Sequence, residues 1–146
     1  MPEKETIKRA KRDKREGKAA STQAGEFVHE EIEHIREGKH GARSTKQAIA
    51  IGLSKARRAG VELPPPKNAS KEVKEQAARD TRKAKSGRKS AKSAKRSRAT
   101  LKALKREGHS AASTRALSRQ AHKAAKKRSA ASRSRSAKKA ATTRKK

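Results

Sequence analysis

The stretch EFVHEEIEHIREGKHGARSTKQAIAIGLSKARRAG, residues 26–60, decides the fold because large apolar side chains are concentrated in it. In its first half, Val28, Ile32 and Ile35 fall at i, i+4 and i+7, so they share one face of a helix. A glycine follows, as it does at the C-terminus of many helices. The pattern predicts a helix over residues 23–37.

The second half of the stretch carries its own helix signals. Ser44 and Gln47 have the S-x-x-Q spacing of a capping box, and Ala, Ile and Leu then form an apolar stripe. We therefore predict a helix over 45–59, and the short loop makes the two helices neighbours in a hairpin. The hairpin is expected to form the core over 22–63, and the prolines of segment 64–69 a stiff linker.

Composition limits the size of this core. Of the 146 residues, 29% are apolar and 40% are charged, and the chain has one Phe and neither Tyr nor Trp. This is too little apolar surface for a core along the whole chain, so we expect dimerisation or nucleic acid to stabilise the hairpin. The chain has no Cys, which excludes disulfides and thiolate metal sites.

Positive charge is concentrated in the C-terminal half. From residue 81 onward there are 25 Lys and Arg against one acid, Glu107, which gives +24 of the net charge of +30. Because like charges at helical spacing oppose the helix, residues 70–146 are predicted to be a largely disordered tail. Segments 94–107 and 112–128 are expected to become helical when phosphate groups remove the repulsion.

The predicted fold class is therefore all-α, a small helical hairpin core with flanking basic helices and a largely disordered C-terminal tail. One flanking helix is expected at 3–15, within a basic N-terminal arm over 1–21. A second is expected at 70–85, after the proline linker.

The segment HEEIEH, residues 29–34, looks like a zinc-protease signature but has the wrong spacing. Its two histidines are five residues apart, about 140° around a helix, whereas a zinc protease needs them four apart on one face. Glu30 and His34 do share a face, and His40 follows in the loop, which leaves an adventitious divalent-cation site as the alternative. We predict no metal site and interpret the glutamates as a solvated acidic face that pairs with basic segments of this chain or of a neighbour.

Other catalytic patterns are missing from the sequence. The glycines are scattered singly, so there is no glycine-rich phosphate loop, and no Ser lies in a nucleophile elbow. The chain is therefore predicted to be non-enzymatic and to need no cofactor.

Nucleic acid is the expected partner of so basic a chain. The loop before the second helix is basic, and the free N–H groups at the helix start also favour an anion, so this loop either anchors one phosphate or is an ordinary basic surface. Because the chain has almost no aromatic side chains to stack on bases, affinity must come from phosphate neutralisation. The predicted nucleic-acid-binding residues are Lys39, His40, Arg43, Lys46, Lys55, Arg57, Arg58, Arg96, Arg98, Lys102, Arg119, Lys123, Lys126, Lys127 and Arg128.

The hairpin sequence resembles a known family. His40 and Gly41, then KQAIAIGLS at 46–54 and AR-x-AG at 56–60, match the pattern of small, very basic, uncharacterised bacterial proteins with a domain of unknown function. The resemblance covers residues 24–66 and implies a bacterial origin and a DNA-binding role, without catalytic residues. In composition alone, the tail resembles the Lys- and Ala-rich tails of histone H1-like proteins that condense DNA.

These observations predict a nucleoid-associated DNA-binding protein that acts without sequence readout. One alternative is an RNA- or ribosome-associated protein, and another is an adaptor whose acidic helix docks a basic partner. No apolar run is long enough for a signal peptide or a membrane span, so we expect a cytoplasmic protein without a membrane partner.

Overall fold

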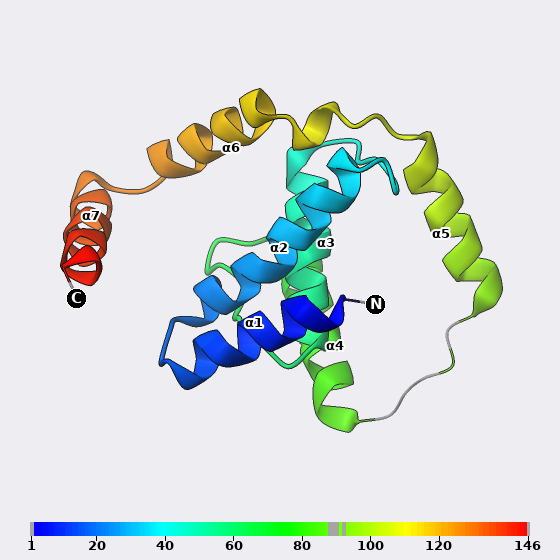
Figure 1. The fold of residues 1–146 in the computed structure, drawn as a ribbon, viewed down its shortest axis with the longest axis horizontal. Helices are drawn as coiled ribbons and strands as arrows, with labels where there is room; N and C mark the ends of the chain where they lie inside the picture. Colours follow the sequence, from blue (N-terminus) through cyan, green and yellow to red (C-terminus); the bar gives the residue numbers. More distant parts are fainter. Residues whose placement is uncertain (1, 88–90, 92, 146) are drawn as a thin grey trace.

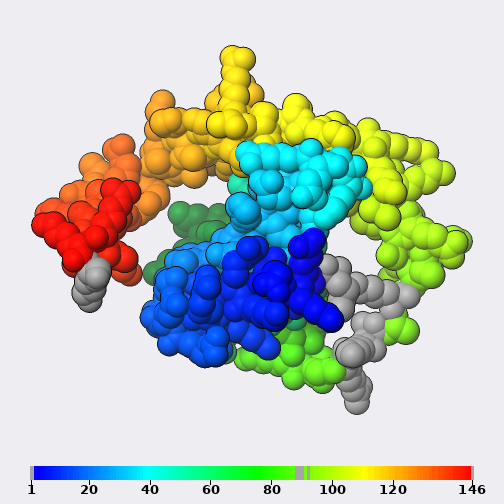
Figure 2. All heavy atoms as spheres, viewed as in Figure 1, coloured from blue at the N-terminus to red at the C-terminus, as the bar shows by residue number. Residues whose placement is uncertain are grey.

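The computed structural model describes residues 2–87, 91 and 93–145, and this part of the chain contains helices and no β-strand. The all-α prediction is confirmed. In chain order the elements are α1 (Lys4–Arg15), α2 (Ala20–Arg36), α3 (Thr45–Arg58), α4 (Lys71–Ser86), α5 (Ala94–Arg106), the short 3₁₀ helix η1 (Ser110–Ala112), α6 (Thr114–Lys126) and α7 (Ala130–Arg144). Helices α1 to α4 form the body, and α5 and α7 stand out from it (Figures 1 and 2).

Helices α2 and α3 form the predicted hairpin. The Ser44 Oγ accepts a hydrogen bond from the Gln47 backbone N–H at 3.2 Å, as the capping pattern predicts. The Gln47 side-chain oxygen in turn accepts a bond from the Arg43 backbone N–H at 2.7 Å. After α2 the chain turns at Gly38, whose φ of +77° lies in the left-handed region that favours glycine. Both ends of the connecting loop are therefore specified locally.

Two apolar clusters hold the hairpin together, one at each end. The cluster at the loop end contains Ile32, Ile35, Ala42, Ala48, Ala111 and Ala112. The cluster at the open end contains Ala10, Ala24, Phe27, Ala56 and Val61. Each cluster thus includes at least one residue from outside the hairpin, in α1 or in η1. The apolar surface that a hairpin of this size lacks is supplied by flanking segments of the same chain.

A close backbone approach joins the α2–α3 loop to the segment before η1. The Gly41 N–H donates to the Leu104 carbonyl at 2.9 Å, and the Ala42 N–H donates to the Gly108 carbonyl at 3.1 Å. A Cβ atom on Gly41 would lie 2.0 Å from the Glu107 carbonyl oxygen. Only glycine permits this contact, which explains one glycine of the family-like pattern.

A buried carboxylate fixes α4 against α3. Asp80 is fully buried and accepts hydrogen bonds from the Arg58 Nε and the Ser54 Oγ, each at 2.7 Å. Gln76, one turn earlier on α4, donates to the same carboxylate at 3.2 Å. The acid is therefore paired by two side chains of α3 and one of α4.

The prediction that residues 70–146 are largely disordered is wrong for the part of the tail that the structure describes, which is mostly helical. Each of its four α-helices is preceded by a serine whose Oγ accepts a hydrogen bond from the backbone N–H three residues later. The pairs are Ser70 with Val73, Ser93 with Arg96, Ser113 with Ala116 and Ser129 with Ser132. Such a cap contributes about 0.5–2 kcal/mol, whereas a like-charge pair at i, i+4 costs about 0.2–0.5 kcal/mol. The prediction gave more weight to the repulsion than to the caps.

The glutamates of α2 are also less solvated than predicted. Glu30 and Glu31 are only 5% and 1% exposed. Glu30 accepts from the Glu3 backbone N–H at 3.2 Å, and Glu31 accepts from the Lys55 Nζ at 2.6 Å. Glu3, which precedes α1, also contacts α2, and its hydrogen bond with His34, together with the nearby Lys39, lowers the pKa of its carboxyl group. The predicted pairing of the acidic helix with basic segments of its own chain is confirmed.

Candidate nucleic-acid interface

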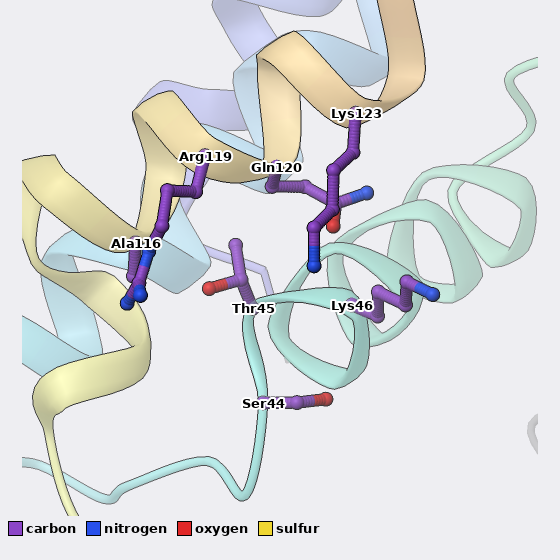
Figure 3. A pocket seen from close by; sticks show the side chains of 7 residues that line it. All are labelled: Ser44, Thr45, Lys46, Ala116, Arg119, Gln120 and Lys123. Carbon is purple, nitrogen blue, oxygen red and sulfur yellow. The ribbon is translucent and has the colours of Figure 1, made fainter. Parts of the chain in front are cut away.

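An open basic pocket lies where the start of α3 meets α6 (Figure 3). The side chain of Lys123 reaches toward the first turn of α3, and Lys46 and Arg119 lie on either side of it. The residues that line the pocket are Ser44, Thr45, Lys46, Ala116, Arg119, Gln120 and Lys123. The fold thus brings Lys46 of α3 together with Arg119 and Lys123 of α6, which lie far from it in the sequence.

The start of α3 adds backbone groups to this positive charge. The backbone N–H of Gln47 already donates to the Ser44 side chain. The backbone N–H groups of Thr45 and Lys46 lie in the first turn, where the helix itself offers them no acceptor. The helix dipole places about half a positive elementary charge at this end. An anion in the pocket would therefore meet backbone donors from α3 and cationic side chains from both helices.

Contacts from the hairpin fix the position of α6. The Thr45 Oγ donates to the Ala111 carbonyl at 2.7 Å, and the Arg36 Nε donates to the Ala112 carbonyl at 3.0 Å. Leu117, in the first turn of α6, packs against the apolar cluster at the loop end of the hairpin. The basic side chains of α6 are consequently carried by a helix that is anchored at its first turn.

Three predicted binding residues are instead engaged inside the protein. His40 is 9% exposed, and its Nε2 lies 3.0 Å from a carboxylate oxygen of Glu31. Lys55 binds the other oxygen of the same carboxylate at 2.6 Å. Arg57 is 7% exposed and donates from its Nε to the Leu63 carbonyl at 2.9 Å. The positive charges of Lys55 and Arg57 are therefore used within the fold, and the His40 ring is turned toward Glu31.

Two further residues of the predicted set are exposed themselves but form ion pairs with acids of the chain. Arg58 holds the buried Asp80, as described above. Lys39 is exposed and lies 2.9 Å from Glu37, whose hydrogen bond raises the pKa of Lys39. Arg43 is exposed in the loop just before α3. Of the six predicted residues outside Lys46 and the tail, Arg43 is therefore the one best placed to meet an anion near the pocket.

The remaining predicted residues lie at the surface of the tail. Arg96, Arg98 and Lys102 are exposed on α5, and Lys126, Lys127 and Arg128 are exposed at and just after the end of α6. The same is true of every Lys and Arg that the structure describes between residues 95 and 145. The predicted binding set did not include the Lys and Arg residues of α7, because the sequence analysis expected no helix there. It also missed Thr45 and Gln120, since nothing in the sequence indicates that α3 and α6 meet.

Residues 3–68 match the model of a family of unknown function, DUF6496. The match includes α1, α2, α3 and the proline-containing segment that follows, and so it supports the resemblance to an uncharacterised domain. Helices α4 and α6, which pack on this unit, lie outside it. Comparisons with curated proteins and with solved structures give no match. In the described part of the chain, no helix combines the length and apolar character that crossing a membrane requires.

Proposed function

We propose that this protein is a non-enzymatic nucleic-acid-binding protein that neutralises phosphate groups with little sequence readout, and that duplex DNA in the nucleoid is its main target. The main support for this proposal is the exposure of the Lys and Arg side chains in the tail. Every Lys and Arg described from residue 95 to residue 145 is exposed, and none of them forms an ion pair with a described acid. In the body, by contrast, several Lys and Arg side chains form ion pairs with Asp or Glu of the same chain.

The shape of the tail suits a phosphate backbone. Helices α5, α6 and α7 contain no Asp or Glu, and each has 13 to 15 residues. Such a helix is about 20 Å long, which is enough to follow several phosphates of one DNA strand. Because the tail has no Phe, Tyr or Trp, stacking on nucleobases should contribute little, and binding should depend on counterion release.

The pocket between α3 and α6 supplies a fixed contact in addition to these helices. Lys46 and Lys123 belong to elements that are held together by buried contacts, so an anion bound there would be positioned relative to the body. We infer that the pocket binds one phosphate at a fixed position on the body, while the tail binds neighbouring phosphates.

Salt dependence of binding tests the proposal. Fluorescence anisotropy of the full chain with a duplex DNA, a shuffled duplex and an RNA hairpin of equal phosphate number would be measured from about 50 to 200 mM salt. If 6–10 phosphates are contacted, the affinity for both duplexes should fall by about 10³–10⁵ over this range. Salt-insensitive binding to one duplex alone would contradict the proposal, and tighter binding to RNA at every salt concentration would make RNA the target.

Two variants that lose the same number of charges show which basic side chains bind phosphate. Replacing Arg133, Arg135, Lys138 and Lys139 of α7 with Gln removes four exposed charges without touching the body. The slope of log affinity against log salt should decrease by about 0.9 for each phosphate that the variant no longer neutralises. The control is the same number of substitutions on α1, at Lys4, Lys8, Lys11 and Lys14, which should change the slope less.

The adaptor alternative has no comparable support. Its acidic helix would have to present free carboxylates to a basic partner. Glu26 is paired with Arg9 at 2.8 Å, and Glu30 and Glu31 are buried.

A further inference from the structure

Two imidazoles and one buried carboxylate converge beside the end of α2. Glu31 and His34 lie one turn apart on α2, and His40 approaches from the loop that follows. One ligand atom from each of the three residues lies within 4.8 Å of the other two. Glu31 is 1% exposed and His40 9% exposed, while the side chain of His34 is 14% exposed. The carboxylate that joins the histidines is thus Glu31, and not Glu30 as the sequence suggested.

The two contacts of the His40 ring need more than the single hydrogen of a neutral imidazole. The His40 Nδ1 lies 3.0 Å from the Gly41 carbonyl oxygen, and its Nε2 lies 3.0 Å from the Glu31 Oε1. Both oxygens are acceptors only, whereas a neutral imidazole carries a single hydrogen. One of the two contacts therefore needs a further positive species between its atoms, either a proton or a metal ion.

The surrounding contacts are those that support metal ligands. A metal-bound histidine usually donates its second ring N–H to a backbone carbonyl or a carboxylate, as the His40 Nδ1 is placed to do with Gly41. The Glu31 Oε2 accepts a hydrogen bond from Lys55, which orients the carboxylate and leaves its Oε1 facing His40. The His34 Nε2 lies 3.0 Å from the Glu3 Oε1, so a fourth oxygen is at hand.

We propose that Glu31, His34 and His40 bind one divalent transition-metal ion of the Zn²⁺ type, with Glu3 or a water molecule as the fourth ligand. Two imidazoles and a carboxylate suit Zn²⁺, whereas Mg²⁺ and Ca²⁺ prefer oxygen ligands throughout. Bonds of about 2.1 Å in a tetrahedral site place ligand atoms about 3.4 Å apart, so the side chains need to close by little more than 1 Å.

Such an ion would have a structural role that is separate from nucleic-acid binding. It would join α2 to the loop that carries Gly41 and Ala42, and this loop bonds to the segment preceding α6. The N-terminal end of α1 would be tied to the same point through Glu3. A failure of the metal site would leave the proposed phosphate contacts of the tail unaffected.

The test uses the full chain without an affinity tag, stripped of metal by a chelator. Titration with Zn²⁺ followed by calorimetry should show one site per chain, and Co²⁺ should give the visible absorption bands of a tetrahedral complex. His34→Gln and His40→Gln are each expected to weaken binding by at least about 100-fold. His29→Gln on the exposed face of α2 and His122→Gln on α6 are matched controls that should bind like the native chain.

The same variants distinguish a bound metal ion from a proton shared between His40 and Glu31. Circular dichroism establishes that each variant is folded, and His34→Gln, whose side chain is the more exposed, serves if His40→Gln does not fold. The proposal is overturned if the native chain shows no saturable single site, or if all four histidine variants bind the metal equally. In either case a proton shared between His40 and Glu31 accounts for the geometry.

Discussion

Gly52 of α3 lies against the backbone of Val28 in α2, so close that a Cβ atom at position 52 would be 2.7 Å from the Val28 Cα. The two helices of the hairpin therefore cross with main chain against main chain at this point. The contact explains why the apolar run KQAIAIGLS carries a glycine in the middle of a helix, where glycine is otherwise unfavourable.

Gly52→Ala should destabilise the protein by about 1–3 kcal/mol, because the added methyl group forces the helices apart. Urea denaturation followed by circular dichroism measures the change. Gly25→Ala on α2 is the control, since nothing lies within 4 Å of its Cβ position. There, the better helix propensity of alanine should stabilise the protein by about 0.5–1 kcal/mol. Equal effects of the two substitutions would show that the helices do not pack this closely.

Gly41→Ala should detach the segment before η1 from the hairpin loop. Its methyl group would meet the Glu107 carbonyl oxygen, and backbone cannot move aside as a flexible side chain can. Amide hydrogen exchange should then become faster at positions 41 and 42, whose N–H groups donate to Leu104 and Gly108 in the native chain. Gly108→Ala is the matched control, because its Cβ position is open. Unchanged protection in Gly41→Ala would contradict the close approach.

Asp80→Asn should cost about 1–3 kcal/mol, because it weakens the buried hydrogen bonds from Arg58 and Ser54 that hold α4. Glu75→Gln, on the same helix, breaks only exposed ion pairs and should change the free energy of unfolding by less than about 0.5 kcal/mol. The comparison is made by thermal unfolding of both variants beside the native chain. If the two variants lose the same stability, Asp80 is not the anchor of α4.

Neutralising the pocket should weaken DNA binding more than neutralising an equal charge elsewhere. The triple variant Lys46→Gln, Arg119→Gln and Lys123→Gln removes the cations that line the site. The control replaces Lys11, Lys14 and Arg15 of α1 with Gln and has the same net charge. Anisotropy titrations at one salt concentration should show a larger decrease in affinity for the pocket variant. Identical decreases would mean that only total charge matters and that the pocket binds no phosphate.

Ser129→Ala should lower the helix content of α7 by removing its N-cap, at a cost of about 0.5–2 kcal/mol to that helix. Cα chemical shifts of residues 130–144 report the change directly. Ser134→Ala in the middle of α7 is the control and should leave the helix intact or slightly strengthen it. Absence of helical shifts in the native chain would contradict the capped helix.

Local signals in the sequence account well for the helices of the body. The spacing of Val28, Ile32 and Ile35 and the capping pattern of Ser44 with Gln47 predicted α2 and α3 to within a few residues. The same reasoning placed helices at 70–85, 94–107 and 112–128, close to α4, α5 and α6, but it expected the last two only on binding and did not expect α7. Serine caps such as Ser93 and Ser113 were present in the sequence, but a like-charge argument outweighed them.

The predicted binding set shows the same division. The sequence identified Lys46, Arg119 and Lys123 as basic residues, but only the fold places them around one pocket. It also treated Lys55 and Arg57 as available for nucleic acid, although one is paired with Glu31 and the other is buried. Composition reveals how many charges a chain carries, and burial decides which of them can meet a partner.

By itself, the sequence determined the all-α class, the hairpin, the helix caps and the concentration of positive charge after residue 80, because each depends on neighbours within a few positions. Only the tertiary structure decided that Ala111 and Ala112 complete the core of the hairpin, that Asp80 docks α4, and that Glu31 meets His34 and His40. These contacts depend on the packing of whole helices. A side chain's neighbours across such an interface have no fixed spacing along the chain, so no local pattern in the sequence records them.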